Sequence, residues 1–223
     1  SNLFVAVSGT ASLYVNNGGR VSSAALTIGN STGGSGEVNA AGTSTQVTAS
    51  GPLQVGSEGY GRLTITGGAQ VSSIGASIGT FPGSIGVASL SGSNSRWTDS
   101  GGSFRVGVGG NGTVSIASGA RVFANTSLVG DGTTGEGIVS IDGTGSAWTN
   151  SQALYAGSLG EGSVVVSNGG TVSNTLSVVG ATVGSSGTME IRDATSSWTS
   201  SSYVIVGDSG TGTLHVKDAG SAS

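Results

Sequence analysis

The chain of 223 residues contains no cysteine, two prolines and a single histidine. Without cysteine there is neither a disulfide framework nor a thiolate metal site. One imidazole with no histidine or cysteine companion does not form a typical transition-metal site, so neither a metal nor a cofactor is expected. No apolar run reaches the roughly 20 residues that cross a bilayer as a helix, so a membrane-spanning helix is excluded.

Charge is also scarce, because charged residues make up 8% of the chain against about 25% in an ordinary soluble domain. The 11 acidic and 7 basic residues are scattered singly and leave a formal charge of −4. No basic stripe could follow a phosphate backbone, so nucleic acid is excluded as a partner. What is abundant is glycine, with 44 residues, and small polar residues. Hydrophobic residues form 35% of the chain and recur at fixed spacing, which predicts a buried core rather than disorder.

A repeat of about 50 residues runs through the whole chain. Its first position is occupied by Leu53, Phe104, Leu154 and Val204, with Leu3 as a degenerate first copy, and its tryptophans are Trp97, Trp148 and Trp198. The steps between equivalent positions are 50 or 51 residues. This spacing predicts a single domain, 1–223, built from the units 3–52, 53–103, 104–153, 154–203 and the partial unit 204–223.

A finer repeat lies inside each unit. A Val or Ile followed by Gly recurs at alternating steps of 23 and about 27 residues, at Ile28-Gly29, Val55-Gly56, Ile78-Gly79, Val106-Gly107, Val129-Gly130, Val179-Gly180 and Val206-Gly207. Each half-unit contains three short pieces of alternating apolar and polar residues, separated by Gly, Asn and Ser turns, and such pieces are typical of β-strands. Three short strands per turn describe one rung of a β-solenoid. The sequence therefore predicts an all-β rod of about nine three-stranded rungs, on the order of 40 Å long at about 4.8 Å per rung.

Three features bear on this interpretation. Residues between two inward positions must point to solvent, and Arg105, Glu190 and His215 all fall on such positions. A β-propeller also suits a period near 50, but one blade has no reason to repeat the same three-part pattern twice. The tryptophans share a column with valines, which favours core or corner packing over an exposed ladder that stacks on sugars.

Several sequence elements recur together: LQVGSEGYGRLTITGGAQVSS from Leu53 to Ser73, VIVGDSGTGTLHV from Val204 to Val216, and S-x-W-T-x-S blocks that begin at Ser95, Ser146 and Ser196. They resemble the repeat of autotransporter (type V secretion) passenger domains and of PEP-CTERM-associated surface proteins, and the likeness covers the whole chain. It implies a right-handed parallel β-helix on the cell surface of a Gram-negative bacterium, secreted or anchored in the outer membrane by a C-terminal translocator barrel outside this sequence. The chain would then be a fragment of a longer passenger.

A glycan-processing enzyme on this fold would need acidic and basic residues clustered on neighbouring rungs, and the sequence predicts no such cluster. Asp131, Glu136 and Asp142 lie in and beside a glycine-rich turn and are interpreted as solvated turn residues. We therefore expect a non-enzymatic adhesin or adhesin stalk that acts in cell adhesion, autoaggregation or biofilm formation. Its expected partners are a host matrix protein, a surface glycan or a second copy on another cell. The alternative is a glycan-binding or glycan-processing β-helix protein.

The candidate binding site is an outward column on the first strand of each rung. Along successive rungs it reads Phe4, Thr27, Gln54, Ser77, Arg105, Leu128, Tyr155, Val178 and Ile205. The four apolar residues that follow Arg105 predict an exposed stripe on the order of 15 Å long, which is typical of a contact site for self-association or for a partner. Two alternatives remain: a neighbouring segment of a longer protein covers the stripe, or the register is off by one residue and the four side chains belong to the core.

Overall fold

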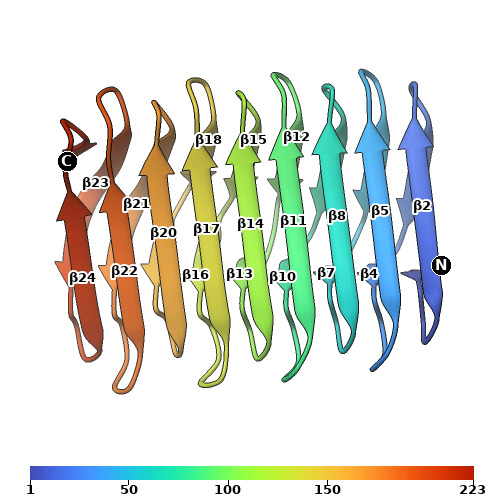
Figure 1. Cartoon of the computed structure of the whole chain (residues 1–223), viewed down its shortest axis with the longest axis horizontal. Coiled ribbons are helices and arrows are strands. Elements are labelled where there is room, and N and C mark those ends of the chain that lie inside the picture. The colour runs from blue at the N-terminus through green and yellow to red at the C-terminus, as the bar shows by residue number, and fades with distance from the viewer.

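The computed structural model describes all 223 residues, and its only regular elements are β-strands. The chain coils into nine rungs stacked along one axis, with its two termini at opposite ends (Figure 1). In Figure 1 the front strands run upward while successive rungs are added from right to left, so the coil is right-handed. The predicted right-handed parallel β-helix is therefore confirmed. No helix long and apolar enough to span a membrane is present.

Each rung contributes three strands, and equivalent strands of neighbouring rungs pair in parallel. The second strands form a nine-stranded sheet, called the second sheet here: β2 (Thr10–Asn16), β5 (Ser35–Ala41), β8 (Tyr60–Thr66), β11 (Ile85–Ser91), β14 (Asn111–Ala117), β17 (Glu136–Asp142), β20 (Glu161–Ser167), β22 (Ser186–Ile191) and β24 (Thr211–Val216). This sheet faces the viewer in Figure 1.

The first and third strands form the other two faces of the rod. The first sheet contains β1 (Leu3–Val5), β4 (Leu26–Ile28), β7 (Leu53–Val55), β10 (Ala76–Ile78), β13 (Ser103–Val106), β16 (Thr126–Val129) and β19 (Ala153–Ala156). The third sheet contains β3 (Arg20–Ser23), β6 (Gln46–Ala49), β9 (Gln70–Ser73), β12 (Arg96–Asp99), β15 (Arg121–Ala124), β18 (Ala147–Asn150) and β25 (Ser221–Ala222). Near the C-terminus, β21 (Thr171–Val179) and β23 (Ser197–Val206) run through the corner and belong to both sheets. The sequence predicts two separate strands at this corner in every rung. In β21 and β23 the structure instead has one strand that continues around the corner.

The alternation along each strand places one core inside the coil. It contains 39 buried hydrophobic residues and extends along the whole rod. The side chains of Trp97, Trp148 and Trp198 belong to it, with exposed fractions between 0% and 2%. The ring of Phe104 packs edge-on against Trp97, with 4.9 Å between the ring centroids. The tryptophan column is therefore core packing, and it is not an exposed platform for sugars.

The recurring Val-Gly or Ile-Gly pair forms the corner between the first and second strands. Gly107 has a φ of +70°, and a Cβ atom there would collide with the backbone of Glu136 on the next rung. A left-handed conformation in such close contact requires glycine. Ala6 occupies the equivalent corner of the first rung with a φ of 62°, a conformation that is unfavourable for a residue with a Cβ atom.

Candidate functional site

The predicted stripe forms one outward column on the first sheet. The strand register pairs Arg105 with Leu128, Leu128 with Tyr155, Tyr155 with Val178, and Val178 with Ile205. Leu128, Tyr155 and Ile205 are half-buried. The expectation of exposure is wrong for Val178, which is only 5% exposed. It lies between Tyr155 and Ile205 in the column, so larger side chains flank it on both sides.

A second apolar column lies beside the first and was missed in the sequence. It occupies the position two residues earlier on the same strands, where the register pairs Ala153 with Leu176 and Leu176 with Tyr203. The Tyr203 side chain is 54% exposed. The signal was present, because Ala153-Leu154-Tyr155 and Tyr203-Val204-Ile205 are runs of consecutive apolar residues. Such runs place apolar side chains on the outer face of a strand as well as on the inner one. We call the two columns together the apolar patch, which consists of Leu128, Ala153, Tyr155, Leu176, Val178, Tyr203 and Ile205. Ala153 and Val178 are buried, and the other five residues are at least partly exposed.

A hollow of about 360 Å³ lies within the apolar patch. Ala153, Tyr155 and Leu176 form its apolar part, and Thr126 and Gln152 are among its polar lining residues. Contiguous apolar side chains on the surface of a soluble chain usually mark a contact site. The patch can therefore take up an apolar side chain of a partner, with hydroxyl and amide groups available at its edge.

Arg105, at the end of the stripe, is not a free cation. Its Nε atom lies 3.4 Å from a carboxylate oxygen of Asp131, and the Asp131 side chain is only 9% exposed. Ser158 donates a hydrogen bond to the same carboxylate. Burial raises the pKa of Asp131, although the charge of Arg105 and the Ser158 hydrogen bond oppose the rise. The interpretation of Asp131 as a solvated turn residue is therefore wrong, because the side chain is buried in an ion pair.

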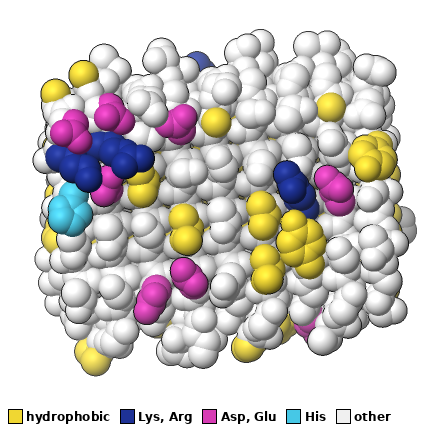
Figure 2. All heavy atoms as spheres, viewed as in Figure 1, with side chains coloured by type: hydrophobic (Ala, Val, Ile, Leu, Met, Phe, Trp, Pro, Cys, Tyr) yellow, Lys and Arg dark blue, Asp and Glu magenta, His cyan; other side chains and the backbone are white.

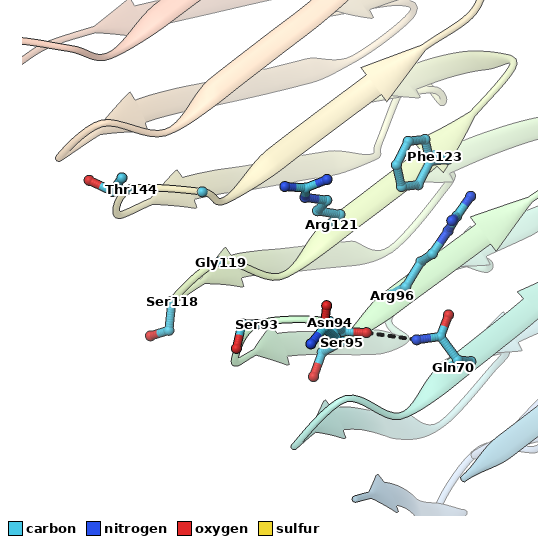
Figure 3. Close-up of a pocket in the computed structure, with 11 residues that line it drawn as sticks. Gln70, Ser93, Asn94, Ser95, Arg96, Ser118, Gly119, Arg121, Phe123 and Thr144 are labelled. Carbon is cyan, nitrogen blue, oxygen red and sulfur yellow. Dashed lines mark hydrogen bonds between the residues drawn. The ribbon is translucent and has the colours of Figure 1, made fainter. Parts of the chain in front are cut away.

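The third sheet carries a second candidate site, which the sequence reasoning did not find. A hollow of about 440 Å³ opens on its outer face, at the turns that lead into β12, β15 and β18. Arg96, Arg121, Gln70 and Phe123 lie in it (Figure 3). The guanidinium carbon of Arg96 lies 4.0 Å from the centroid of the Phe123 ring. We call this site the arginine hollow.

The second sheet offers no comparable site. Its outer face is covered mostly by small polar side chains and backbone, with a small group of hydrophobic side chains right of centre and the densest group of charged side chains at the left end (Figure 2). That end includes a network in which Arg192 and Lys217 both pair with Glu190. Glu136 and Glu161 are partners on adjacent rungs, so two carboxylates do stack where the sequence predicted no cluster. No group of three or more His, Asp or Glu side chains comes together to hold a metal ion.

The fold and the repeated register define the chain as a parallel β-solenoid. No protein-family model matches it, and no curated protein or solved structure matches it significantly.

Proposed function

We propose that the chain is a rigid, non-enzymatic segment of a passenger protein on the surface of a Gram-negative bacterium, where it acts as an adhesin or as the stalk of one. In this proposal the full protein is secreted or held in the outer membrane by a translocator barrel beyond this sequence. The observation that carries the proposal is the unbroken parallel register of nine second strands from β2 to β24. The resemblance of the repeat motifs to autotransporter passengers points in the same direction.

An unbroken register suits a spacer because each rung contacts only its neighbours and adds about 4.8 Å of length. The rod can therefore be lengthened or shortened by whole units without a change in its cross-section. Its outward positions are largely Ser and Thr, as in the third-strand column, which reads Ser72, Thr98, Phe123, Thr149 and Ser173 and has Phe123 as its one large side chain. Such a surface remains hydrated with few charges, which suits a segment whose task is to hold another domain away from the cell.

The apolar patch supports the adhesin form of the proposal. It is a strip parallel to the rod axis, formed by side chains at the same positions of successive rungs. Two rods that lie side by side can bring two such strips together, which removes apolar surface from water in both copies. A second copy on a neighbouring cell is therefore the partner that we propose for the patch, and autoaggregation is the expected activity.

The exchange of one repeat unit distinguishes a stalk from an adhesin that binds through its own flank. In the displayed full-length protein, residues 104–153 are replaced by a second copy of residues 53–103, which preserves the number of rungs. The exchange removes Leu128 and Ala153 from the apolar patch and keeps its other five residues. A stalk should retain adhesion and aggregation, measured by cell binding and sedimentation, because its length is unchanged. Loss of both activities, with equal surface display, would contradict the stalk and favour binding by the flank of the rod.

The double change Leu128→Ser and Tyr155→Ser tests the apolar patch directly. If the patch joins copies on neighbouring cells, sedimentation of displaying cells should slow strongly. The matched control is Tyr60→Ser with Ile138→Ser, which removes similar side chains, 37% and 40% exposed, from the second sheet. Equal aggregation of the two double variants and the parent, with surface display and melting unchanged, would exclude the patch and leave the stalk.

A further inference from the structure

We propose that the arginine hollow binds an acidic saccharide chain, whose carboxylate or sulfate groups lie on Arg96 and Arg121. This proposal assigns a ligand class to the flank of the rod and so deepens the proposed adhesin role. Its biological meaning rests on that role. The binding itself is a property of the purified chain. Its failure can therefore be told apart from failure of the cell-surface role.

The first argument is uncompensated charge. Arg96 and Arg121 are register partners on adjacent rungs, so two cationic side chains leave the same face of the sheet from paired positions. The ion pairs of the structure involve Arg105, Arg192 and Lys217, and neither Arg96 nor Arg121 lies within 4.0 Å of a carboxylate. Like charges directly opposite one another on a sheet are destabilising. A bound anion would relieve this repulsion, although the chain as a whole carries a charge of −4.

The second argument is that the hollow is already ordered. Arg96 lies over the Phe123 ring, and its Nε atom donates a hydrogen bond of 2.9 Å to the hydroxyl of Thr98. The amide of Gln70 donates to the backbone carbonyl of Asn94 at 2.6 Å. Figure 3 shows Arg96 extending toward Phe123, with Arg121 between Arg96 and the turn that carries Thr144. Side chains that are fixed before binding lose little conformational entropy when the ligand arrives.

The third argument concerns the kind of anion. The turns beside the arginines present the hydroxyls of Ser93, Ser118 and Thr144, one on each of three successive rungs. With rungs about 4.8 Å apart, this spacing is comparable with the length of one pyranose residue in an extended glycan. A chain parallel to the rod axis can therefore place one sugar on each rung, with its acidic groups on the arginines and its hydroxyls on the turns.

A nucleic acid fits the hollow less well. Its backbone would need a longer series of cations than two arginines. Single-stranded binding also uses free aromatic faces on which bases stack, whereas Phe123 is the only aromatic residue of the hollow and Arg96 covers one of its faces. Two charges with flanking hydroxyls therefore favour a saccharide.

The test is calorimetric titration of the purified chain at low salt. The probes are an alginate hexamer with one carboxylate per sugar, a heparin hexasaccharide that also carries sulfates, neutral maltohexaose and a single-stranded DNA hexamer. We expect one or both acidic saccharides to bind and maltohexaose to show no heat of binding. Comparison of the alginate and heparin titrations identifies the preferred acidic group. Affinity should fall steeply as salt is added, because the contacts are ionic.

Three variants test the contacts, and each introduces a residue that the same column already carries on another rung. Arg96→Gln matches Gln70, Arg121→Ala matches Ala147, and Phe123→Thr matches Thr98 and Thr149. Each arginine variant should weaken acidic-saccharide binding by about tenfold or more, because each removes a charge-assisted hydrogen bond. Phe123→Thr should weaken it less, by releasing Arg96.

Arg20→Gln is the matched control, since Arg20 is an exposed residue at the first position of β3, in the same column. It should leave the affinity within about twofold. The proposal is overturned if neither acidic saccharide binds, if Arg20→Gln weakens binding as much as Arg96→Gln, or if DNA binds more tightly than both saccharides. Binding that all arginine variants retain would also overturn it.

Discussion

Two buried hydrogen-bond donors lack an acceptor at the same place in the core, and this defect can be repaired by one substitution. The indole of Trp97 donates to the hydroxyl of Ser73 on the preceding rung at 3.0 Å. The indole of Trp198 donates to the side-chain oxygen of Asn174 at 2.9 Å. The residue at the equivalent position below Trp148 is Ala124, and the indole nitrogen of Trp148 has no partner. The Nδ2 group of Asn150, which is the register partner of Ala124, also lacks one.

Ala124→Ser should therefore stabilise the protein. A serine hydroxyl at this position can accept hydrogen bonds from Trp148 and from Asn150, as Ser73 does from Trp97. A buried donor without a partner costs about 1–3 kcal/mol, and burying the new hydroxyl cancels part of the gain. We expect a net gain of about 1–2 kcal/mol. In a domain of this size each 1 kcal/mol raises the Tm by about 2–4 °C.

The assay is thermal unfolding followed by circular dichroism, with Ala88→Ser as the matched control. Ala88 is fully buried in β11, and its register partners are the apolar Leu63 and Val114. The same added hydroxyl there should lower the free energy of unfolding by about 1–3 kcal/mol. The same Ala-to-Ser change should thus raise the free energy of unfolding at position 124 and lower it at position 88.

A double-mutant cycle with Trp148→Val attributes the gain to the indole. Valine occupies this column on alternate rungs, so the replacement is compatible with the coil. In the Trp148→Val background the benefit of Ala124→Ser should fall by about half, because only the Asn150 donor remains. A lower Tm for Ala124→Ser, or an unchanged gain without the indole, would refute the reasoning.

Two further predictions concern backbone conformation and pH. Gly107→Ala should lower the Tm strongly, because the added Cβ atom would meet the backbone of the next rung. Ala6→Gly should raise the free energy of unfolding by about 0.5–1 kcal/mol, because glycine adopts the positive φ of this corner without strain. A thermal melt that ranks these two in the opposite order would contradict the corner geometry. Burial raises the pKa of the Asp99 carboxyl, although the hydrogen bonds that it accepts from Ser73 and Gly75 oppose the rise. The contribution of Asp99 to stability is therefore fully present below the ordinary carboxyl pKa of about 4. It is lost as the pH rises through the raised pKa. Asp99→Asn should therefore be more stable than the parent at neutral pH and lose this advantage near pH 3, and a constant difference in urea unfolding across this range would contradict the assignment.

The fold could be predicted because each rung repeats the same physical requirement. Inward residues such as Val139 and Ile141 face identical positions about 4.8 Å away, and the second strands of neighbouring rungs pair with no shift of register. Corner positions such as Gly107 require a positive φ beside another backbone. Both requirements leave a period in the sequence, so rung number and strand order follow from spacing, which also favours the burial of Trp148.

The surface sites could be predicted only in part, because they depend on which columns lie side by side. The stripe from Leu128 to Ile205 follows one position along the rungs, and its register is as the spacing indicates. The burial of Val178 depends on the size of its neighbours, which spacing does not report. The arginine hollow combines β12 and β15 with the turns before them, and the proximity of Arg96 to Phe123 depends on side-chain direction. No single column reveals it.

The two candidate sites lie on different faces of the rod, and this separates what each experiment can decide. The apolar patch belongs to the first sheet and the arginine hollow to the third. Replacement of residues 104–153 removes Leu128, Arg121 and Phe123 together, so loss of adhesion after the exchange shows that the flank binds but leaves the face undecided. The Leu128→Ser and Tyr155→Ser pair leaves every residue of the arginine hollow in place, and Arg121→Ala leaves the apolar patch intact. Because inward positions are fixed by the stack, outward departures from Ser and Thr are the positions at which two otherwise identical rods can differ in what they bind.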